Sequence, residues 1–420
     1  MPRSVRSIEL LAPARDAEIA IAAIDHGADA VYLGGPDFSA RHQAGNPVEQ
    51  LARVADYAHR YRARVYVTLN TLLQDEELPR AEAMIQEVCS AGIDALIVQD
   101  MAVLEMDLPP VELHASTQAH IDTVEKALFL HRAGFSRLVL ARELSLPQIE
   151  AIARESGAKI EAFVHGALCV SYSGQCYLSQ ALCGRSANRG RCAQVCRLPF
   201  DVLDPEGHLL RTGTHALSLK DMNRSAHLEA LIDAGVCSLK IEGTLCAAHT
   251  PADTPQKARL EQALSKLGGT EFEARHIAIA FPSEYFLPLS AVSALRRQTL
   301  EALREVRLRS VTGQRQTLPH AHPPLPPGLD TDYRLNVSNR LARQFYRQCG
   351  AARLAPAYEQ QKVPGAQLAV CLHCLQYSLG LCPRQHPGKG FPYLVLRHGR
   401  FALRAEFDCA HCRMKLFALP

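Results

Sequence analysis

The sequence predicts an α/β protein: a TIM-like (β/α)₈ barrel followed by a smaller C-terminal α+β module. Eight short apolar runs alternate with longer amphipathic stretches between Ile8 and Gly243, which is the pattern of repeated βα units. Polar residues follow many of these runs, as expected where barrel strands end at one mouth. The 420 residues are enough for one barrel of roughly 250 residues and an appended module.

The predicted strands are short and rich in aliphatic and β-branched residues. In order they are IELLAP, DAVYLGG, RVYVTLN, DALIVQD, VELHAST, SRLVLAR, KIEAFVHG and VCSLKIEG. The stretches between them have apolar positions at helical spacing, as in AEIAIAAIDHGA, which ends with a glycine stop signal.

The polar residues at the strand ends favour a closed barrel over an open doubly wound sheet. An open sheet would concentrate such residues at one switch point. Here they follow many different strands, although turn and cap chemistry would also account for any single one. They are Asn70, Asp100, Ser116, Thr117, Arg142, Glu143, His165 and Glu242.

The chain divides into four predicted segments. The barrel spans 1–248 and contains a cysteine-rich loop at 165–199. A connecting α/β segment covers 249–311, and a proline-rich linker covers 312–330. A cysteine-rich module follows at 331–420.

The overall composition excludes several classes of protein. A net charge of +3 is too small to indicate nucleic-acid binding by itself. No apolar run approaches the roughly 18 residues of a membrane span, and the N-terminal residues do not resemble a signal peptide. We therefore expect a cytoplasmic protein without a membrane partner. In that compartment, 14 cysteines indicate metal or redox chemistry before disulfides.

The loop after the seventh strand concentrates cysteines and contains no Asp or Glu. A loop of this length inside a compact domain is usually functional. Four converging thiolates can hold zinc or an iron–sulfur cluster, and the uneven gaps here favour the cluster. Scattered structural thiols are the third possibility. The loop cysteines are Cys169, Cys176, Cys183, Cys192 and Cys196.

The same loop carries an excess of positive charge. Guanidinium groups suit phosphate or carboxylate, so an anionic substrate is one interpretation. The other is that the arginines balance the negative charge of thiolates around a metal centre. The residues are Arg185, Arg189, Arg191 and Arg197.

A second group of cysteines lies near the C-terminus. Two CxxC pairs are typical of a zinc ribbon, and spacing alone selects Cys371, Cys374, Cys409 and Cys412. Cys382 is the fifth thiol of the group. A small module with few apolar residues needs such a site for stability, so we expect a structural role.

Three segments of the chain resemble the peptidase U32 family. They are ELLAPARDAEIAIAAIDHGADAVYLGG, FVHGALCVSYSGQCYLSQALCGRSANRGRCAQVCRLPF and LSLKDMNRSAHLEALIDAGVCSLKIEG. NVSNRLARQFY, PAYE and FDCAHCRM resemble the C-terminal part of its ribosomal-RNA 5-hydroxycytidine synthase branch. Compared with that branch, the region after Gly243 is shortened.

This resemblance implies a barrel that binds one four-iron four-sulfur cluster. Family members hydroxylate C5 of a pyrimidine in ribosomal or transfer RNA, or the ring of a quinone precursor. For the RNA branches it implies prephenate as the hydroxyl source. The implied cluster ligands are Cys169, Cys176, Cys192 and Cys196. The implied C-terminal metal ligands, for a possible structural zinc, are Cys374, Cys382, Cys409 and Cys412.

The leading hypothesis is an RNA pyrimidine hydroxylase with a small anionic co-substrate. His165 and Glu242 are its candidate acid–base groups, and the loop arginines would hold carboxylates or phosphates. Tyr172 or Tyr177 could stack on a splayed base. The alternative is a peptidase, although the chain has neither H-E-x-x-H nor G-x-S-x-G. A third interpretation is a non-catalytic binding protein whose cysteines hold only structural metal.

Overall fold

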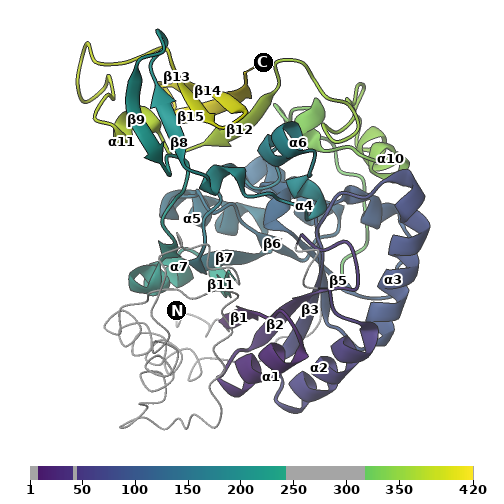
Figure 1. The fold of residues 1–420 in the computed structure, drawn as a ribbon. Coiled ribbons are helices and arrows are strands. Elements are labelled where there is room, and N and C mark those ends of the chain that lie inside the picture. Colours follow the sequence, from purple (N-terminus) through teal and green to yellow (C-terminus); the bar gives the residue numbers. More distant parts are fainter. Residues whose placement is uncertain (1–7, 41–44, 243–316, 420) are drawn as a thin grey trace, which may run out of the picture.

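The computed structural model describes residues 8–40, 45–242 and 317–419, and its larger part is a closed parallel barrel (Figure 1). Strands pair in the order β7-β11-β1-β2-β3-β4-β5-β6, and the pairing of β6 with β7 closes the barrel. The predicted barrel and its eight strands are therefore confirmed. The strands are β1 (Glu9–Pro13), β2 (Ala30–Gly34), β3 (Arg64–Leu69), β4 (Ala95–Val98), β5 (Glu112–Ala115), β6 (Arg137–Val139), β7 (Lys159–Gly166) and β11 (Val236–Ile241).

Helices between these strands cover the outside of the barrel (Figure 1). Local capping explains where several begin. The Asp16 carboxylate accepts a hydrogen bond from the Ile19 amide at 3.1 Å, and the Thr123 hydroxyl accepts one from the Lys126 amide at 3.2 Å. The helices are α1 (Ala17–Asp25), α2 (Val48–Arg60), α3 (Leu78–Ser90), α4 (Val124–Ala133), α5 (Leu146–Ser156) and α7 (Leu228–Asp233).

The position after β4 is filled by a helix from the C-terminal part of the chain. β4 leads only into a short 3₁₀ turn, η3 (Met101–Glu105), and α10 (Arg340–Gln348) packs against that turn. Phe345 of α10 is completely buried in the apolar core of the barrel. Asn339 caps α10 and also donates to the Asp100 carboxylate at 2.8 Å, which fixes the helix to the end of β4.

A second sheet, antiparallel, stands beside the barrel (Figure 1). Its strand order is β12-β15-β14-β13-β8-β9, so its first two strands in the chain come directly after the cysteine loop. Residues 200–214 thus belong to this sheet, although the sequence segmentation placed them with the barrel. The strands are β8 (Phe200–Leu203), β9 (Leu209–Thr214), β12 (Gln367–Cys371), β13 (Tyr393–His398), β14 (Phe401–Asp408) and β15 (Arg413–Ala418).

The cysteine loop joins the two parts of the molecule. It contains α6 (Leu178–Cys183) and runs along the edge of β12. There the Tyr172 amide donates to the Val370 carbonyl at 3.0 Å and the Tyr177 amide to the Leu368 carbonyl at 2.7 Å. After β9 the chain returns to the barrel, where β10 (Met222–Asn223) pairs antiparallel with the end of β7. The C-terminal sheet therefore supports the loop directly.

The proline-rich stretch crosses the barrel surface as extended chain. Its described part, 317–330, is anchored by the Ala321 amide on the Ala133 carbonyl at 3.2 Å. Gly134 lets it approach closely, since a Cβ there would lie 3.0 Å from the His320 ring. The predicted connecting segment 249–311 lies outside the described residues. Among the helices that are described, none has the length and apolar character that a bilayer crossing requires.

Candidate functional site at the barrel mouth

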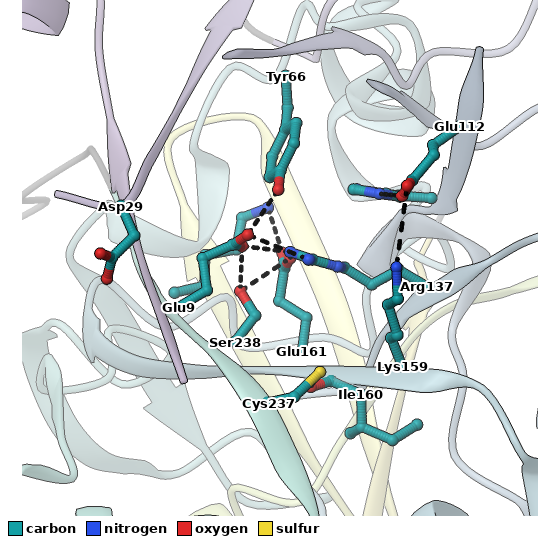
Figure 2. A network of polar contacts seen from close by, with 12 residues as sticks. Glu9, Asp29, Tyr66, Glu112, Arg137, Lys159, Ile160, Glu161, Cys237 and Ser238 are labelled. Carbon is teal, nitrogen blue, oxygen red and sulfur yellow. Dashed lines mark hydrogen bonds and ion pairs between the residues drawn. The ribbon is translucent and has the colours of Figure 1, made fainter. Parts of the chain in front are cut away.

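A network of buried charged groups fills part of the barrel interior (Figure 2). Arg137 forms an ion pair with Glu9 and another with Glu161, where the nitrogen–oxygen distance is 3.1 Å. The Lys240 ammonium lies 2.8 Å from a Glu161 oxygen. The Tyr66 hydroxyl donates to Glu9 at 2.6 Å. Glu9 and Glu161 therefore each have a cationic partner.

These contacts determine the charge states inside the barrel. Burial by itself raises the pKa of Glu9, but the charge and hydrogen bonds of Arg137 outweigh it and lower the pKa to about 2. The pKa of Glu161 is also lowered, because Lys240 and Arg137 outweigh its burial. Glu9 and Arg137 begin their strands, so the network lies toward the N-terminal end of the barrel, where we assign it to stability.

The predicted acid–base residues lie at the opposite end. The Glu242 amide donates to the His165 carbonyl at 2.8 Å, so their backbones are adjacent. The Glu242 carboxylate forms an ion pair with Arg142, whose guanidinium lies 4.3 Å from the Phe163 ring centroid. Gly166 is required there, because a Cβ on it would approach the Glu242 Cβ to 2.5 Å. Glu242 is thus held by an arginine at the mouth, beside the strand that leads into the cysteine loop.

Four loop cysteines come together beyond this mouth. A hydrogen bond with Cys176 lowers the pKa of Cys169 to about 6. Burial, together with the charges of Cys169 and Cys192, raises the pKa of Cys196 to about 12. Such mutual effects require proximity. Cys169 and Cys192 are solvent-exposed, so the group is accessible from outside.

The four thiols are not packed around a single point in this structure. Within the described chain, no three of the four sulfurs lie within 4.8 Å of one another. Thiolates around a tetrahedral zinc would lie about 3.8 Å apart, given zinc–sulfur bonds of about 2.3 Å. As placed, the four sulfurs are therefore farther apart than thiolates around one zinc ion, as are the C-terminal thiols described below.

The loop arginines divide into two kinds. Arg189 makes a two-pronged ion pair with Glu77, at 2.7 and 2.9 Å. Arg197 donates to the Leu168 carbonyl at 2.7 Å, next to Cys169, and to residues 218 and 219. These two brace the loop internally. Arg185 and Arg191 lie at the loop surface, with one hydrogen bond from Arg185 to the Arg191 carbonyl at 3.2 Å.

Neither loop tyrosine is free to stack on a base. Tyr177 is buried, and its hydroxyl donates to the Asn336 side chain at 3.0 Å. Tyr172 is also buried and stacks on His120, with ring centroids 4.6 Å apart. The expectation of an available tyrosine is therefore wrong in this conformation, because both rings are used to pack the loop.

Two mouth residues received no role from the sequence. His120 follows β5 and presents a buried ring to the loop. Glu143 follows β6, and its buried Oε2 has no hydrogen-bond partner within the described residues. Burial raises the pKa of Glu143. The position of Glu143 after a strand was visible in the sequence, but its orphaned oxygen depends on packing between distant segments.

The C-terminal cysteines separate into two locations. Cys374, Cys382, Cys409 and Cys412 line one pocket beside α11 (Leu375–Ser378). Cys371 is fully buried on β12, and the charges of Cys169 and Cys196 add to burial in raising its pKa. In the described chain no three of the pocket sulfurs lie within 4.8 Å of one another, so they must move closer to hold a tetrahedral zinc.

Comparison with known proteins gives one family. The family model described as Peptidase family U32 matches residues 15–260. The chain is 58% identical over 243 residues to the 23S rRNA 5-hydroxycytidine C2501 synthase of Escherichia coli (strain K12), covering 58% of this chain and 37% of that protein. It is 35% identical over 251 residues to the tRNA hydroxylation protein P1 of Bacillus subtilis (strain 168), covering 57% and 60%.

A third relative is named as a protease and not as an RNA-modifying protein. The chain is 35% identical over 256 residues to a protein named collagenase from Porphyromonas gingivalis (strain ATCC BAA-308 / W83), covering 57% of this chain and 62% of that protein. This chain thus spans less than two thirds of the length of each of these relatives. The family match covers most of the barrel and the cysteine loop and includes more than half of the chain. The chain belongs to the peptidase U32 family.

Proposed function

We propose that this protein hydroxylates C5 of a pyrimidine base in ribosomal or transfer RNA. The observation that carries the proposal is the gathering of four cysteines at the barrel mouth, in a chain that is 58% identical over 243 residues to an rRNA 5-hydroxycytidine synthase. TIM-barrel enzymes place their chemistry at this C-terminal face. The relatives named for tRNA hydroxylation support the same class of reaction.

The cluster would be held by Cys169, Cys176, Cys192 and Cys196. When bound, a four-iron four-sulfur cluster would supply a Lewis-acidic, redox-active centre near the mouth. The chain's own residues hold the loop around it. Arg197 fixes the carbonyl next to Cys169, and Arg142 orients Glu242 at the mouth. His165 and Glu242 are proposed to move protons there.

Binding of an RNA backbone requires positively charged residues outside the cysteine site. Arg185 and Arg191 lie at the surface of the loop. Residues 367–420 contain seven Lys and Arg but only two Asp and Glu, although the whole chain has a net charge of only +3. Such a local excess suits an RNA backbone. Prephenate is the proposed hydroxyl source, and the C-terminal cysteines are proposed to hold a structural zinc.

The test is a comparison of modified nucleosides in RNA from cells with and without the gene. We expect loss of a 5-hydroxypyrimidine in ribosomal or transfer RNA, restored by the wild-type gene but not by Cys192→Ser. Anaerobically purified protein should show the visible absorbance of an iron–sulfur cluster. Unchanged 5-hydroxypyrimidine levels in both RNA classes would refute the assignment.

A peptidase is the second candidate, because one relative is named collagenase. A cysteine nucleophile would need an imidazole base within reach. The Cys169 thiol has Cys176, and not a histidine, as its side-chain hydrogen-bond partner. Gelatin hydrolysis that is lost in Cys169→Ser, together with unaltered RNA, would favour this candidate.

A further inference from the structure

A cavity of about 280 Å³ opens on the C-terminal module, between α11 and the turn that joins β14 to β15. Its volume lies near the lower end of the roughly 300–1,000 Å³ that small-molecule pockets span. The four cysteines of its lining belong to the proposed structural metal site. Leu372, Tyr377 and Phe407 add an apolar part to the lining. The cavity therefore contains a surface that metal binding does not explain.

Two of these apolar side chains lie at the rim of the cavity. Tyr377 is 60% exposed and Leu372 is 43% exposed. They are two of the six large apolar residues that are exposed in the described chain. Apolar side chains that are exposed together mark interaction surfaces more often than those that are exposed singly. Tyr377 thus has the accessible ring that the buried loop tyrosines, Tyr172 and Tyr177, do not have.

Positively charged side chains lie beside this apolar rim. Arg384 and Arg413 are exposed and line the cavity. The Arg384 Nη1 lies 3.0 Å from the Cys412 sulfur, which holds its guanidinium at the cavity. The one acidic residue of the lining is Asp408, whose carboxylate lies 3.0 Å from the Nδ1 of His411. Two guanidinium groups against one carboxylate favour a ligand that carries negative charge.

Arg413 connects the cavity to the cysteine loop and to the charged face of the sheet. Its guanidinium lies 5.8 Å from the ring centroid of Tyr172, which belongs to the loop. It also begins β15, where the alternation of side chains places it on the same face as Lys415. The cavity is therefore continuous with a row of cations and adjoins the loop that carries the proposed cluster ligands.

We infer that this cavity is a stacking site for an unpaired base of single-stranded RNA, with the base on the Tyr377 ring and the neighbouring phosphates on Arg413 and Lys415. Aromatic rings that stack on bases, next to cations that follow the backbone, are typical of single-strand binding surfaces. Residues 367–420 carry seven Lys and Arg but only two Asp and Glu, so a polyanion suits this module better than an apolar protein surface.

The inference rests on the proposed function for the nature of the ligand. It adds an RNA-binding site outside the barrel and outside residues 15–260, which match the family model. Stacking on an aromatic ring accepts every base, so the site would contribute affinity without selecting a sequence. It would hold RNA that flanks the nucleotide at the barrel mouth.

The first test uses the absence of tryptophan from this chain. Tyr377→Trp places a single indole at the cavity, and we expect a short single-stranded oligouridylate to quench its fluorescence in the anaerobically purified, full-length protein. The matched control is Tyr61→Trp, because Tyr61 is 62% exposed and directly follows α2 on the outside of the barrel. The oligonucleotide should leave the fluorescence of the control unchanged.

The second test measures affinity by fluorescence anisotropy with the same oligonucleotide. Tyr377→Ala should weaken binding by roughly fivefold to 150-fold, which is the contribution of one stacked base. Tyr377→Phe should retain most of the affinity, because it keeps the ring. Tyr61→Ala should bind as the wild type does. Thermal unfolding and metal content of each variant check that the fold and the adjacent thiols are intact.

The outcomes separate this inference from the proposed function. If the oligonucleotide binds without quenching Tyr377→Trp and without loss of affinity in Tyr377→Ala, or quenches both tryptophan variants equally, the stacking site is wrong and the proposed function is unaffected. If the wild type does not bind it, the inference is also wrong, whereas the nucleoside comparison still decides RNA hydroxylation. A dimer that Tyr377→Ala converts to a monomer in analytical ultracentrifugation would overturn the inference by identifying a contact between copies of this chain.

Discussion

At the scale of single residues, the barrel interior depends on charges that are paired out of water. Arg137 is buried and forms ion pairs with two carboxylates that are themselves buried or nearly so. Taking one member from such a group leaves its partners desolvated and unpaired, which costs more than the intact pair contributes. The interior is therefore sensitive to single substitutions.

We expect Arg137→Met to destabilise the protein by about 3–5 kcal/mol, because Glu9 and Glu161 lose their shared cation. Urea unfolding monitored by circular dichroism measures the change. The matched control is Arg154→Met, which removes an exposed ion pair with Glu155 and should cost about 0–1 kcal/mol. Equal losses of stability in the two variants would contradict the structural role assigned to the network.

Acid stability should depend on Glu9. Its pKa falls from 4.5 to about 2 on folding, so its contribution is complete above pH 4.5 and is lost as the pH falls toward 2. This contribution is about 3 kcal/mol at neutral pH. Glu9→Gln should therefore be less stable near neutrality and show a smaller loss of stability between pH 5 and pH 3. Parallel urea titrations of both proteins at these pH values provide the check, and identical pH dependences would disprove the prediction.

At the scale of elements, the cysteine loop is held from both sides. Arg197 ties it to the end of β7 and to the segment after β9, while its backbone follows the edge of β12. The loop has little regular structure of its own beyond α6 and short turns. Its shape therefore depends on hydrogen bonds and packing supplied by other elements.

Arg197→Met should reduce the iron content per chain, because no guanidinium then fixes the segment around Cys169. Iron and sulfide assays on anaerobically purified protein give the measurement. Arg185→Met is the control, because that side chain lies at the surface and makes one hydrogen bond within the loop. The same iron content in both variants would show that Arg197 does not position the ligands.

At the scale of the whole molecule, one face of the second sheet is buried in the core and the other carries partly exposed charged side chains. Leu394, Leu403 and Leu416 lie on the buried face. Arg397 and Lys415 lie on the other, since each alternates with these core positions along its strand. This sheet also supports the cysteine loop. RNA bound on the face that carries Arg397 and Lys415 would therefore lie on the module that holds the proposed cluster ligands in place.

If RNA binds the face that carries Arg397 and Lys415, its affinity should depend on these two residues and on the salt concentration. We expect the double variant Arg397→Ala/Lys415→Ala to bind single-stranded RNA more weakly. Its plot of log affinity against log salt should flatten by about 0.7 for each phosphate that the variant no longer neutralises. Fluorescence anisotropy over a range of salt concentrations measures both. Arg53→Ala, an exposed position on α2 of the barrel, should leave the slope unchanged. A slope unaffected in the double variant would place RNA elsewhere.

Local patterns were sufficient for much of this fold. Alternating apolar runs and helical spacing identify all eight barrel strands, because the periodicity of a strand or a helix depends only on residues close together in the sequence. Long-range packing was not visible in that way. The sequence did not indicate that α10 fills the position after β4, or that residues 200–214 join a sheet formed near the C-terminus.

The same distinction between local pattern and long-range packing applies to the candidate site. The sequence by itself determined the barrel, the cysteine-rich loop at its mouth and the resemblance to a family, since these depend on residue type and spacing. Only the tertiary structure decided which arginines brace the loop, which tyrosines are buried, and that Cys371 lies away from the other C-terminal thiols. The reason is that burial and hydrogen bonding are properties of residues brought together from distant parts of the chain.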